Sequence, residues 1–557
     1  MRKNILSLVL VTLGATALTS CIQEVEPQSS TVTTEQASNA PGSFDNFVST
    51  VTSEINGKAS YYPSAIGSYK WDFGYPSQML ARDVMGQDIV LNPGKSSFMY
   101  WYSSSRALGP QYMVCQVPWT VYYGWIKNCN TVISLAGENP DDSKKSGAGI
   151  AYAMRALFYQ DMAQMFAQKT YGQDKDAETV PIVTEDASID YTHNPRATNE
   201  KMWNFILSDL DKAEQYLADY KRTDKTTPDL SVVYGLKARA YLVMCDWANA
   251  EKYAKLAQEG YSVMTEDEYT SRETGFNTPT NSWMMCVTYK SDDPCLKNDD
   301  CDTSWGSQMS LEIDPNASGC GYASNYGDSK SIDYHLYNTI PSTDFRKKCF
   351  IDFSVDNMTS SEKLEKIGEY SDYPSWIVKS ASKTGYGPGG FSLKFRTANG
   401  VEGHTSQYKG FLQSVPLMRV EEMKLIEAEA AGMQDEARGI QLLTAFAKTR
   451  DAQYVYGQHN EAYGNTNTSA FQNEIWWQRR VELWGEGFST FDIKRLNKGI
   501  IRSYANTNHM EDYRWNTTSV PQWMTYCIVQ TETNYNYDCT QNPTPSAPTE
   551  DSEEYVW

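Results

Sequence analysis

SVVYGLKARAYLVMCDWANAEKYAKLAQ, residues 231–258, indicates the fold class of this chain most clearly. Apolar residues recur in it at steps of three and four, which predicts two short helices: Val233, Leu236, Ala240 and Met244, then Trp247, Ala250, Ala254 and Ala257. Asp246 between them is a typical helix N-cap, and the small alanines let antiparallel helices approach closely. The pattern indicates a tetratricopeptide-like pair, which needs neighbours to bury its apolar face. An ordinary helical hairpin of another α fold remains the alternative.

The same helical periodicity continues on both sides of this hairpin. Helices are predicted at 79–85, 112–135, 146–168, 199–219, 417–431, 435–450 and 471–485. Residues 43–264 therefore form an N-terminal helical region, and residues 411–557 form a C-terminal helical region with an irregular tail. Residues 265–410 between them are rich in Gly, Asn, Asp, Ser and aromatics, which indicates a loop-rich functional insert within one mainly α domain.

The first 42 residues are expected to direct and anchor the chain rather than to fold. Arg2 and Lys3 precede an apolar run at 5–17, a pattern that matches a signal peptide covering residues 1–20. The apolar run is too short to span a membrane. Leu18-Thr19-Ser20-Cys21 matches a lipobox, so Cys21 is the predicted lipidation site. Residues 21–42 are polar and rich in Pro, Ser and Thr, which is typical of a flexible tether. The chain is thus expected at a membrane through its lipid.

Composition limits the classes of ligand. The net charge of −20 and the isoelectric point near 4.8 argue against nucleic-acid binding, which needs clustered Lys and Arg. Aromatic residues make up 13% of the chain, with 38 Tyr and 15 Trp, which suggests aromatic surface.

No metal or cofactor is expected. The five histidines lack ligand spacing with cysteine, and the acidic run at 298–302 lacks the Gly and the distal Glu of a calcium loop. Ten of the eleven cysteines follow Cys21, and Cys295 with Cys301 is the best disulfide candidate, although the sequence does not give the pairing.

Several stretches, one of them within the hairpin above, carry a family resemblance. They are AYAMRALFYQDMAQMFAQKTYG (151–172), WNFILSDLDKAEQYL (203–217) paired with LKARAYLVMCDWANAEKYA (236–254), MRVEEMKLIEAEA (418–430), and WWQRRVELWGEGFSTFDIKRL (476–496). With the lipoprotein signal, they resemble the SusD/RagB family of outer-membrane nutrient-binding lipoproteins of Bacteroidota. The last stretch departs from the family signature at Gln478 and at Phe488-Ser489, where an acid and an arginine are usual.

The resemblance implies a fold and a function. The family's fold is a scaffold of tetratricopeptide-like helix pairs with a looped ligand face. Its members pair with a SusC-type TonB-dependent transporter at the cell surface and hand it glycans or, in the RagB branch, peptides. The chain is therefore expected to be a surface-exposed outer-membrane receptor for an oligomeric nutrient, most simply a glycan, and not an enzyme.

The resemblance also locates the ligand site. One wall is expected from residues 88–102, with Trp101 and Tyr102 as stacking rings and Asp88 and Asn92 as polar contacts. The other wall is expected from the insert, with candidates Trp283, Tyr289, Trp305, Tyr322, Asn325, Tyr326 and Tyr334. An aromatic ring packs on the C–H face of a sugar while polar neighbours bind its hydroxyls. Each of these aromatics could instead anchor its loop.

Two groups of carboxylates have a structural interpretation. Glu482 and Glu486 lie one helical turn apart, and a catalytic pair is conceivable, but the adjacent Arg479 and Arg480 favour an ion-pair network. The acidic stripe Glu421, Glu422, Glu427 and Glu429 is predicted to be a solvated helix face.

A secreted glycoside hydrolase is the second hypothesis. It would need two carboxylates across a cleft, and no such pair stands out. Besides the nutrient receptor and the hydrolase, the third hypothesis is an adaptor that binds only protein, through its helical repeats.

Overall fold

The computed structural model describes residues 42–56, 70–91, 96–103, 108–297, 303–314, 316, 321–461, 468–546 and 552–557. The chain divides into two units, residues 1–46 and 47–557, and all elements below except the start of α3 belong to the second. The predicted signal peptide, Cys21, nearly all of the tether, Asn92, Cys301 and the acidic run at 298–302 lie outside the described residues. Those assignments stay predictions.

The N-terminal region is helical, as predicted. Its helices are α3 (Ser43–Ser53), α4 (Tyr75–Val84), α5 (Met99–Tyr102), α6 (Met113–Ala136), α7 (Asp142–Phe166), α8 (Asn199–Tyr216), α9 (Leu230–Met244) and α10 (Trp247–Ala257). Helix α7 begins four residues earlier than predicted, because the Asp141 carboxylate accepts hydrogen bonds from the backbone N–H groups of Ser143 and Lys144.

The hairpin at 231–258 is confirmed as α9 and α10. Helix α9 ends at Cys245, which adopts a left-handed conformation with φ of +58°, and Asp246 then caps α10 by accepting from Asn249 N at 3.2 Å. Gly172, which closes the 151–172 motif, donates its N–H to Val243 O at 3.2 Å. A Cβ at Gly172 would lie 2.4 Å from Cys245 Sγ, so this approach to the hairpin needs glycine.

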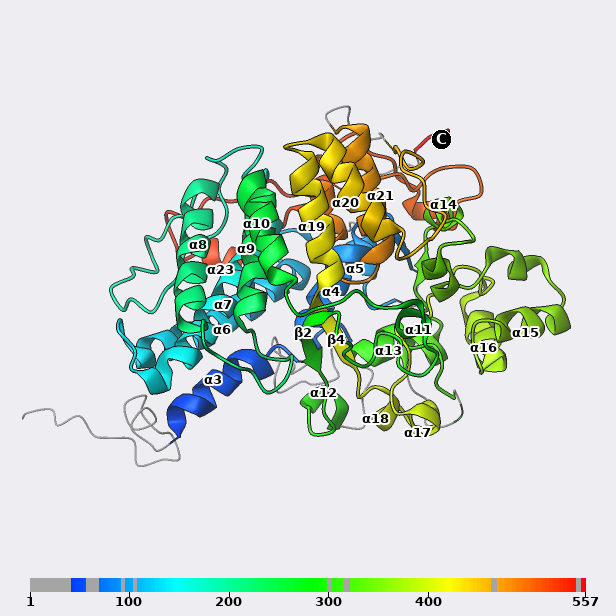
Figure 1. Cartoon of the computed structure of the whole chain (residues 1–557), viewed down its shortest axis with the longest axis horizontal. Helices are drawn as coiled ribbons and strands as arrows, with labels where there is room; N and C mark the ends of the chain where they lie inside the picture. The colour runs from blue at the N-terminus through cyan, green and yellow to red at the C-terminus, as the bar shows by residue number, and fades with distance from the viewer. Residues whose placement is uncertain are drawn as a thin grey trace, which may run out of the picture. The chain divides into compact units, whose positions relative to one another are not determined.

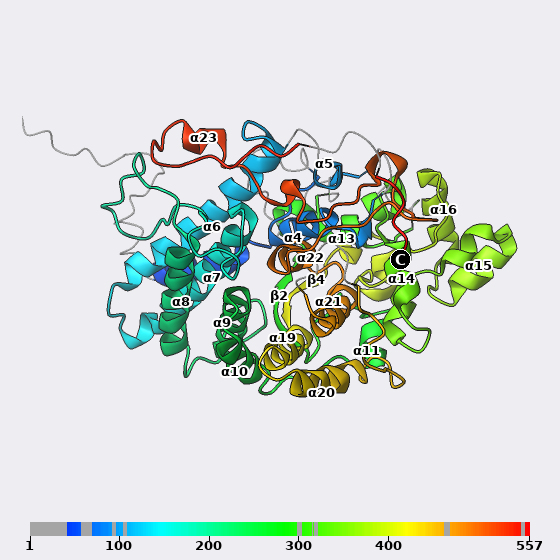
Figure 2. The same cartoon turned by 90° about the horizontal axis from the view of Figure 1, so that it is seen from above.

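The C-terminal region continues the same row of helices. It contains α19 (Val420–Gly432), α20 (Glu436–Ala447), α21 (Ala470–Glu482), α22 (Ser489–Arg495), the 3₁₀ turns η6 (Glu511–Tyr513) and η7 (Gln522–Met524), and α23 (Gln530–Thr533). From α6 to α10 each helix packs on the next, α10 packs on α19, and α19 packs on α20 and α21 (Figures 1 and 2). The mainly helical fold class is therefore confirmed.

The predicted helix at 417–431 is wrong at its start. Residues Ser414–Arg419 form strand β4, which pairs antiparallel with β2 (Trp283–Thr288) from the insert. All six residues of β4 are buried. A short apolar run fits a buried strand as well as a buried helix, so the sequence pattern did not distinguish the two. This pairing ties the insert to the helical scaffold.

The insert is more regular than predicted. It holds α11 (Glu266–Thr270), α12 (Pro294–Lys297), α13 (Trp305–Met309), α14 (Tyr334–Thr339), α15 (Ser360–Gly368), α16 (Pro374–Thr384), α17 (Gly400–His404) and α18 (Gln407–Gly410). It also holds strand β3 (Ser331–Ile332), the π-helical turn η3 (Tyr322–Tyr326) and the 3₁₀ turns η4 (Phe345–Cys349) and η5 (Phe353–Asn357). Its own core includes Ile351, Val355, Ile367 and Ile377. Short elements of this kind carry too few turns for periodicity to identify.

A buried cluster of charges joins the insert to α19 and α21. We call it the charged core: Glu421, Glu482, Glu486, Arg346, Lys394, Arg419 and Arg450. Glu482 accepts from Arg450 Nε at 3.0 Å, from Arg419 Nη1 at 3.0 Å and from Arg346 Nη1 at 3.2 Å. Burial raises the pKa of Glu482, but Arg450, Arg419 and Arg346 outweigh it and hold that pKa well below the ordinary value. The prediction of an ion-pair network is confirmed, but not its partners. The adjacent Arg479 and Arg480 pair with Asp492 and Asp88 instead of with Glu482 or Glu486.

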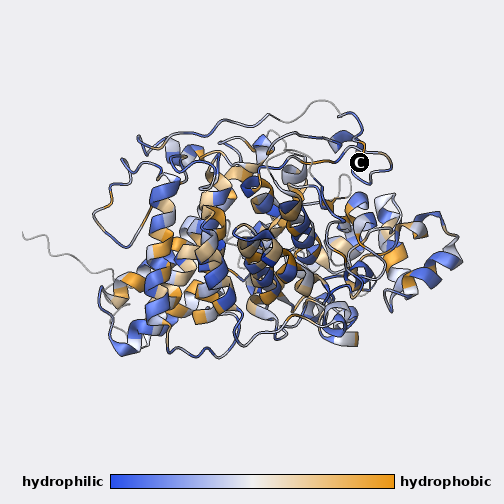
Figure 3. Cartoon of the chain, turned by 45° about the horizontal axis from the view of Figure 1, so that its top comes forward, coloured by the Kyte–Doolittle hydropathy of each residue, from blue (hydrophilic) through white to orange (hydrophobic). Residues whose placement is uncertain are grey.

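The prediction of a solvated acidic face on α19 is wrong. Glu421, Glu422 and Glu429 are each at most 1% exposed. Each carboxylate has an arginine partner from another element: Glu421 pairs with Arg450, Glu422 with Arg239, and Glu429 with Arg495, at 2.6–2.9 Å. The arginines come from distant parts of the sequence, so the residues of α19 alone could not show that its acids are buried. In Figure 3 hydrophilic positions therefore occur on the packed central helices as well as on the loops.

Candidate ligand-binding cavity

The cavity begins where two distant segments pair as strands. Strand β1 (Ile89–Val90) pairs antiparallel with β3, with Ile89 opposite Ile332 and Val90 opposite Ser331. Asp333 N donates to Asp88 O at 3.0 Å and extends this contact. The start of the 88–102 segment therefore lies beside the insert, and Val90 and Leu91 line a cavity there.

A third segment, residues 506–514 near the C-terminus, closes the cavity. Asn508 fixes it to β3 and α14, because its Nδ2 donates to Ile332 O at 2.9 Å and its Oδ1 accepts from Tyr334 N at 2.8 Å. The cavity measures about 760 Å³. Small-molecule sites typically measure about 300–1,000 Å³, so the volume suits an oligosaccharide.

One side of the cavity is aromatic. The rings of Tyr334 and Phe353 meet edge to face with centroids 4.7 Å apart, and those of Tyr337 and Phe353 at 5.3 Å. Phe353 leans on Gly390, where an added Cβ would lie 2.4 Å from its ring. Tyr386, which lies in a glycine-rich loop, lines the cavity and is 56% exposed. The ring of Tyr386 is therefore accessible to a ligand.

Polar groups also line the cavity, and two of them are aspartates, one at the N-cap of η5 and one within it. Asp352 caps η5 by accepting from Ser354 N at 2.8 Å; burial raises its pKa, but the bonds from Ser354 outweigh this and keep the pKa below the ordinary value. Asp356 accepts from Gly389 N at 2.9 Å, and burial raises its pKa. Glu511 and Arg514 lie on the side formed by residues 506–514. The lining thus carries three acidic side chains and one arginine, a negative balance.

Six of the predicted contact residues do not reach this cavity. Asp88, Trp101, Tyr102, Trp283, Tyr289 and Trp305 are each at most 5% exposed and belong to the interior. Trp305 packs edge to face on Phe395 at 5.0 Å, and Trp101 packs on Trp71 at 5.8 Å. A ring buried on all sides offers no face to a sugar, so the expectation that these residues touch ligand is wrong in this structure.

Two of those six support the cavity from behind. Asp88 forms an ion pair with Arg480 at 2.6 Å. The hydroxyl of Tyr102 is hydrogen-bonded to His509 Nδ1 at 2.7 Å, and His509 is one of the lining residues. Val90 and Leu91 of the 88–102 segment thus line the cavity, while Asp88 and Tyr102 hold other groups in place, and the role of this segment as a ligand wall stays a prediction.

The remaining predictions divide between the cavity and a separate turn. Tyr334 lines the cavity and is partly exposed. Tyr322, Asn325 and Tyr326 lie on η3, are not among the lining residues, and keep some exposure, 43% for Tyr326. Their role as ligand contacts stays a prediction.

Sequence reasoning missed most of the lining: Tyr337, Asn338, Asp352, Phe353, Asp356, Tyr386, Asn506, Asn508, Glu511 and Arg514. One signal was available. Tyr386 lies in the run GYGPGG (385–390), and a tyrosine among glycines cannot pack as helical core. Residues 506–514 carried no comparable signal, because only the fold brings them to the insert.

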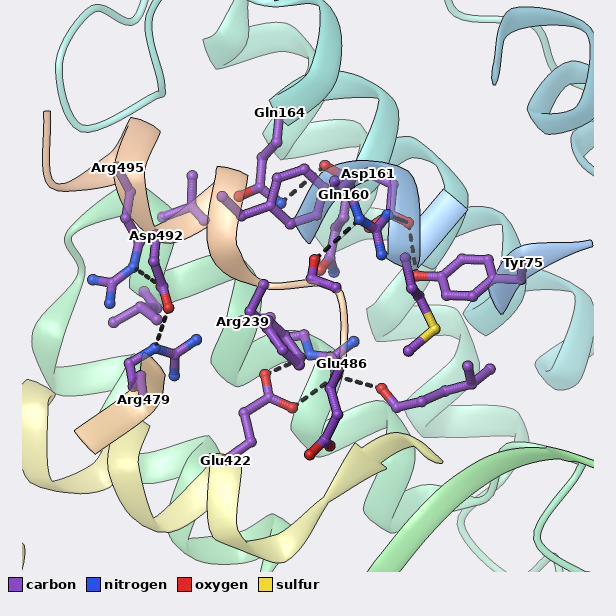
Figure 4. A pocket seen from close by; sticks show the side chains of 18 residues that line it. Tyr75, Gln160, Asp161, Gln164, Arg239, Glu422, Arg479, Glu486, Asp492 and Arg495 are labelled. Atoms are coloured by element: carbon purple, nitrogen blue, oxygen red, sulfur yellow. Dashed lines mark hydrogen bonds and ion pairs between the residues drawn. The ribbon is translucent and has the colours of Figure 1, made fainter. Parts of the chain in front are cut away.

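A second cavity lies inside the helical scaffold. It measures about 40 Å³, room for a few waters but not for a sugar ring. Arg82 and Asp161 pair across it at 2.7 Å, as do Arg239 and Glu422, and Asp492 bridges Arg479 and Arg495 (Figure 4). Its charges are engaged with one another, so we assign it to the scaffold.

Comparisons with known proteins agree with this architecture. Residues 29–242 match a family described as "starch-binding associating with outer membrane", and residues 162–545 match the SusD family. A SusD-like protein of Formosa agariphila is 22% identical over 514 residues, covering 89% of this chain and 92% of the relative. Across the described ranges, no helix has the length and apolarity needed to cross a bilayer.

Solved structures show the same fold. A SusD-like carbohydrate-binding protein of Bacteroides vulgatus superposes with a TM-score of 0.67 at 22% identity, covering 89% of this chain and 97% of the other. Surface glycan-binding protein A of Bacteroides thetaiotaomicron, in complex with laminarihexaose, gives 0.61 at 16% identity, covering 90% and 98%. Because the family match at 162–545 spans more than half of the sequence, this chain belongs to the SusD family.

Proposed function

We propose that this protein is a non-catalytic receptor that holds an uncharged oligosaccharide in the 760 Å³ cavity. The observation that carries the proposal is the lining itself, in which an accessible tyrosine and an aromatic cluster face a rim of amides and carboxylates. Aromatic planes pack on the C–H faces of sugars, and polar side chains bind the hydroxyls. The complex of the related surface glycan-binding protein A with laminarihexaose supports a glycan as the ligand class.

The charge of the lining favours an uncharged glycan over a uronic or sulfated one. Three acids and one arginine line the cavity, and the chain carries a net charge of −20. Like charges repel, and the repulsion grows where low-dielectric walls focus the field. An anionic polysaccharide would therefore be excluded at low ionic strength.

A hydrolase is the alternative that the two aspartates of η5 raise, because their pKa values are shifted in opposite directions. Both side chains, however, hold backbone: Asp352 caps η5, and Asp356 binds the N–H of Gly389. A Cβ at Gly387 would overlap the Asp356 carboxylate, so that loop is fitted around it. These contacts account for both aspartates as loop anchors.

The proposal also includes delivery of the bound ligand to a transporter. The receptor is anchored in the outer membrane through lipid on Cys21, faces the outside, and passes its ligand to a SusC-type TonB-dependent transporter. Membership of the SusD family and the lipobox at 18–21 support this part. In wild-type cells the protein is expected to co-purify with an outer-membrane barrel, and Cys21→Ala is expected to lose the membrane fraction while keeping ligand binding.

Calorimetry of the purified chain tests ligand class, with neutral oligosaccharides, anionic oligosaccharides and peptides as probes. Saturable binding of a neutral oligosaccharide, with unchanged sugar after overnight incubation, is the expected result. Binding of peptides alone would move the chain to a RagB-like peptide receptor, and shortened sugar products would establish a hydrolase. Either result would overturn the proposal.

A further inference from the structure

A second aromatic surface lies away from the cavity. Among the tyrosines that the structure describes, the three most exposed are Tyr537 at 72%, Tyr535 at 71% and Tyr191 at 60%. They come from two short segments, residues 190–194 and 534–538, more than 300 residues apart in the chain. The fourth most exposed, Tyr386, lines the cavity. We call Tyr191, Tyr535, Tyr537 and His193 the tyrosine platform.

The two segments are locked together rather than merely adjacent. Tyr537 N donates to Thr192 O at 2.8 Å, so Tyr537 lies beside the residue that follows Tyr191. Asn536 is 2% exposed; its Nδ2 donates to Asn194 O at 2.7 Å, and its Oδ1 accepts from Asn194 N at 3.1 Å. A buried asparagine thus fixes both backbones, and the exposed rings on either side of it are held by a preorganised frame.

Polar groups accompany the rings. His193 Nδ1 lies 3.3 Å from Asp538 Oδ2, and its ring centroid is 5.6 Å from that of Tyr537. Asp190 accepts from Thr192 N at 2.9 Å and from Thr192 Oγ1 at 2.7 Å. These bonds lower the pKa of Asp190, Thr192 Oγ1 contributing most, so its carboxylate stays charged. Rings with exposed faces, flanked by carboxylates and an imidazole, match the chemistry that binds sugar hydroxyls and C–H faces.

The charge near the rings selects among ligands. Asp186, Asp190 and Asp538 are exposed, and His193 is the basic side chain within 190–194 and 534–538. An anionic polymer would be repelled, whereas a neutral polysaccharide meets no charge penalty. This is the preference that the cavity shows.

The platform and the cavity lie far apart. Helix α23, next to the 534–538 segment, lies at the left in both views, whereas α14 at the cavity lies at the right (Figures 1 and 2). None of the platform residues is among those lining the cavity. A short oligosaccharide that fills the cavity would therefore leave the platform free, and a long chain could touch both.

We propose that the tyrosine platform is a second binding site for the same uncharged polysaccharide, contacted by parts of the chain that extend beyond the cavity. This inference rests on the proposed function of the cavity. Two linked contacts raise the apparent affinity because the second binding event becomes intramolecular. The platform would thus increase affinity for polymers without changing affinity for short oligosaccharides.

Affinity electrophoresis separates this inference from the proposed function. Wild-type protein, Tyr535→Ala/Tyr537→Ala, Tyr386→Ala and the control Tyr408→Ala are run through gels containing laminarin, starch, xylan or galactomannan. Tyr408 is 39% exposed on α18, away from both sites, and serves as a matched loss of one surface ring. Calorimetry with the hexasaccharide of the strongest polymer is then run on each variant.

The platform variant is expected to bind the polymer at least about tenfold more weakly and the hexasaccharide with unchanged affinity. Unchanged hexasaccharide binding also shows that this variant is folded. Tyr386→Ala is expected to weaken both. Equal polymer affinity of the platform variant and wild type would overturn the second site and leave the cavity standing. If the wild-type protein binds none of the polymers, both proposals are wrong. If the platform variant loses only its co-purification with the transporter, the platform binds a protein partner instead.

Discussion

Carboxylates occur in two contrasting settings in this protein, the charged core around Glu482 and the rim of the cavity. In the charged core, Glu421, Glu482 and Glu486 are each at most 5% exposed and meet basic groups at 2.7–3.2 Å. At the rim, Glu511 is exposed and lines the cavity. The same chemical group thus stabilises the fold in one place and is available to a ligand in the other. Burial and pairing decide the role, not residue type.

The largest expected effect is on stability, from Glu482→Gln. Removing this charge leaves three buried guanidinium groups short of a counter-charge, which typically costs about 3–5 kcal/mol. The free energy of unfolding in urea measures the loss. The control is Glu402→Gln, which breaks an exposed pair with Lys409 and should leave stability unchanged. Equal stability of both variants would show that the charged core is not structural.

The next effect is a pH dependence from a buried lysine outside the charged core. Lys494 Nζ donates to Ala167 O at 2.9 Å and Thr525 Oγ1 at 3.0 Å, and burial lowers its pKa to about 7. Between pH 7 and the ordinary lysine pKa, the unfolded chain binds more protons than the folded one, so stability rises with pH. The slope is at most about 1.4 kcal/mol per pH unit.

Urea unfolding of wild type and Lys494→Met from pH 7 to pH 10 tests this dependence. Other titrating groups cancel in the difference, so the stability of wild type minus that of the variant should increase with pH. Parallel curves would mean that Lys494 is charged in the folded protein. The fold would then tolerate a buried charge that has no carboxylate partner, in contrast to the paired charges of the charged core.

A smaller effect is expected at the cavity, and on binding instead of stability. Tyr386→Ala removes an exposed ring, and we expect affinity for a neutral oligosaccharide to fall about tenfold, which corresponds to about 1.4 kcal/mol. The melting temperature should not change, because more than half of the residue is exposed. Calorimetry and thermal melting check both, with Tyr408→Ala as the control. A lower melting temperature with intact binding would reverse the assignment.

The smallest effect concerns the rim charge. Glu511→Gln is expected to leave affinity for a neutral oligosaccharide within about twofold, because rim charges contribute little to binding of an uncharged ligand. The same change should weaken the exclusion of an anionic oligosaccharide, seen as faster association at low salt. If Glu511→Gln weakens binding of the neutral oligosaccharide as much as Tyr386→Ala does, Glu511 contacts the sugar directly and does not act only through its charge.

The sequence predicted the scaffold well because its information is local. Helical periodicity and the Cys245-Asp246 junction identified α9 and α10. The adjacent arginines indicated an ion-pair network but not the partners of Glu482, because Arg479 and Arg480 pair with other acids. The burial of Glu421 could not be predicted in the same way, because Arg450 reaches it from another helix. Trp101 and Trp305 were chosen as loop aromatics, and the fold buries them.

The cavity was only half predictable. The resemblance implies that residues 88–102 and the insert lie together, and β1 does pair with β3. The third side, residues 506–514, and the loop around Tyr386 reach the cavity only through contacts such as those of Asn508 with β3. A site assembled from three distant segments carries no periodic or spacing signal, so the residues that face the ligand had to come from the structure.

Binding of a neutral oligosaccharide in the cavity between α14, η5 and residues 506–514 can be seen in a crystal structure of the protein soaked with the tightest-binding hexasaccharide. We expect sugar rings packed on Tyr386 and beside Phe353, with hydroxyls bound by the rim. An ordered sugar elsewhere on the protein, with this cavity empty, would contradict it.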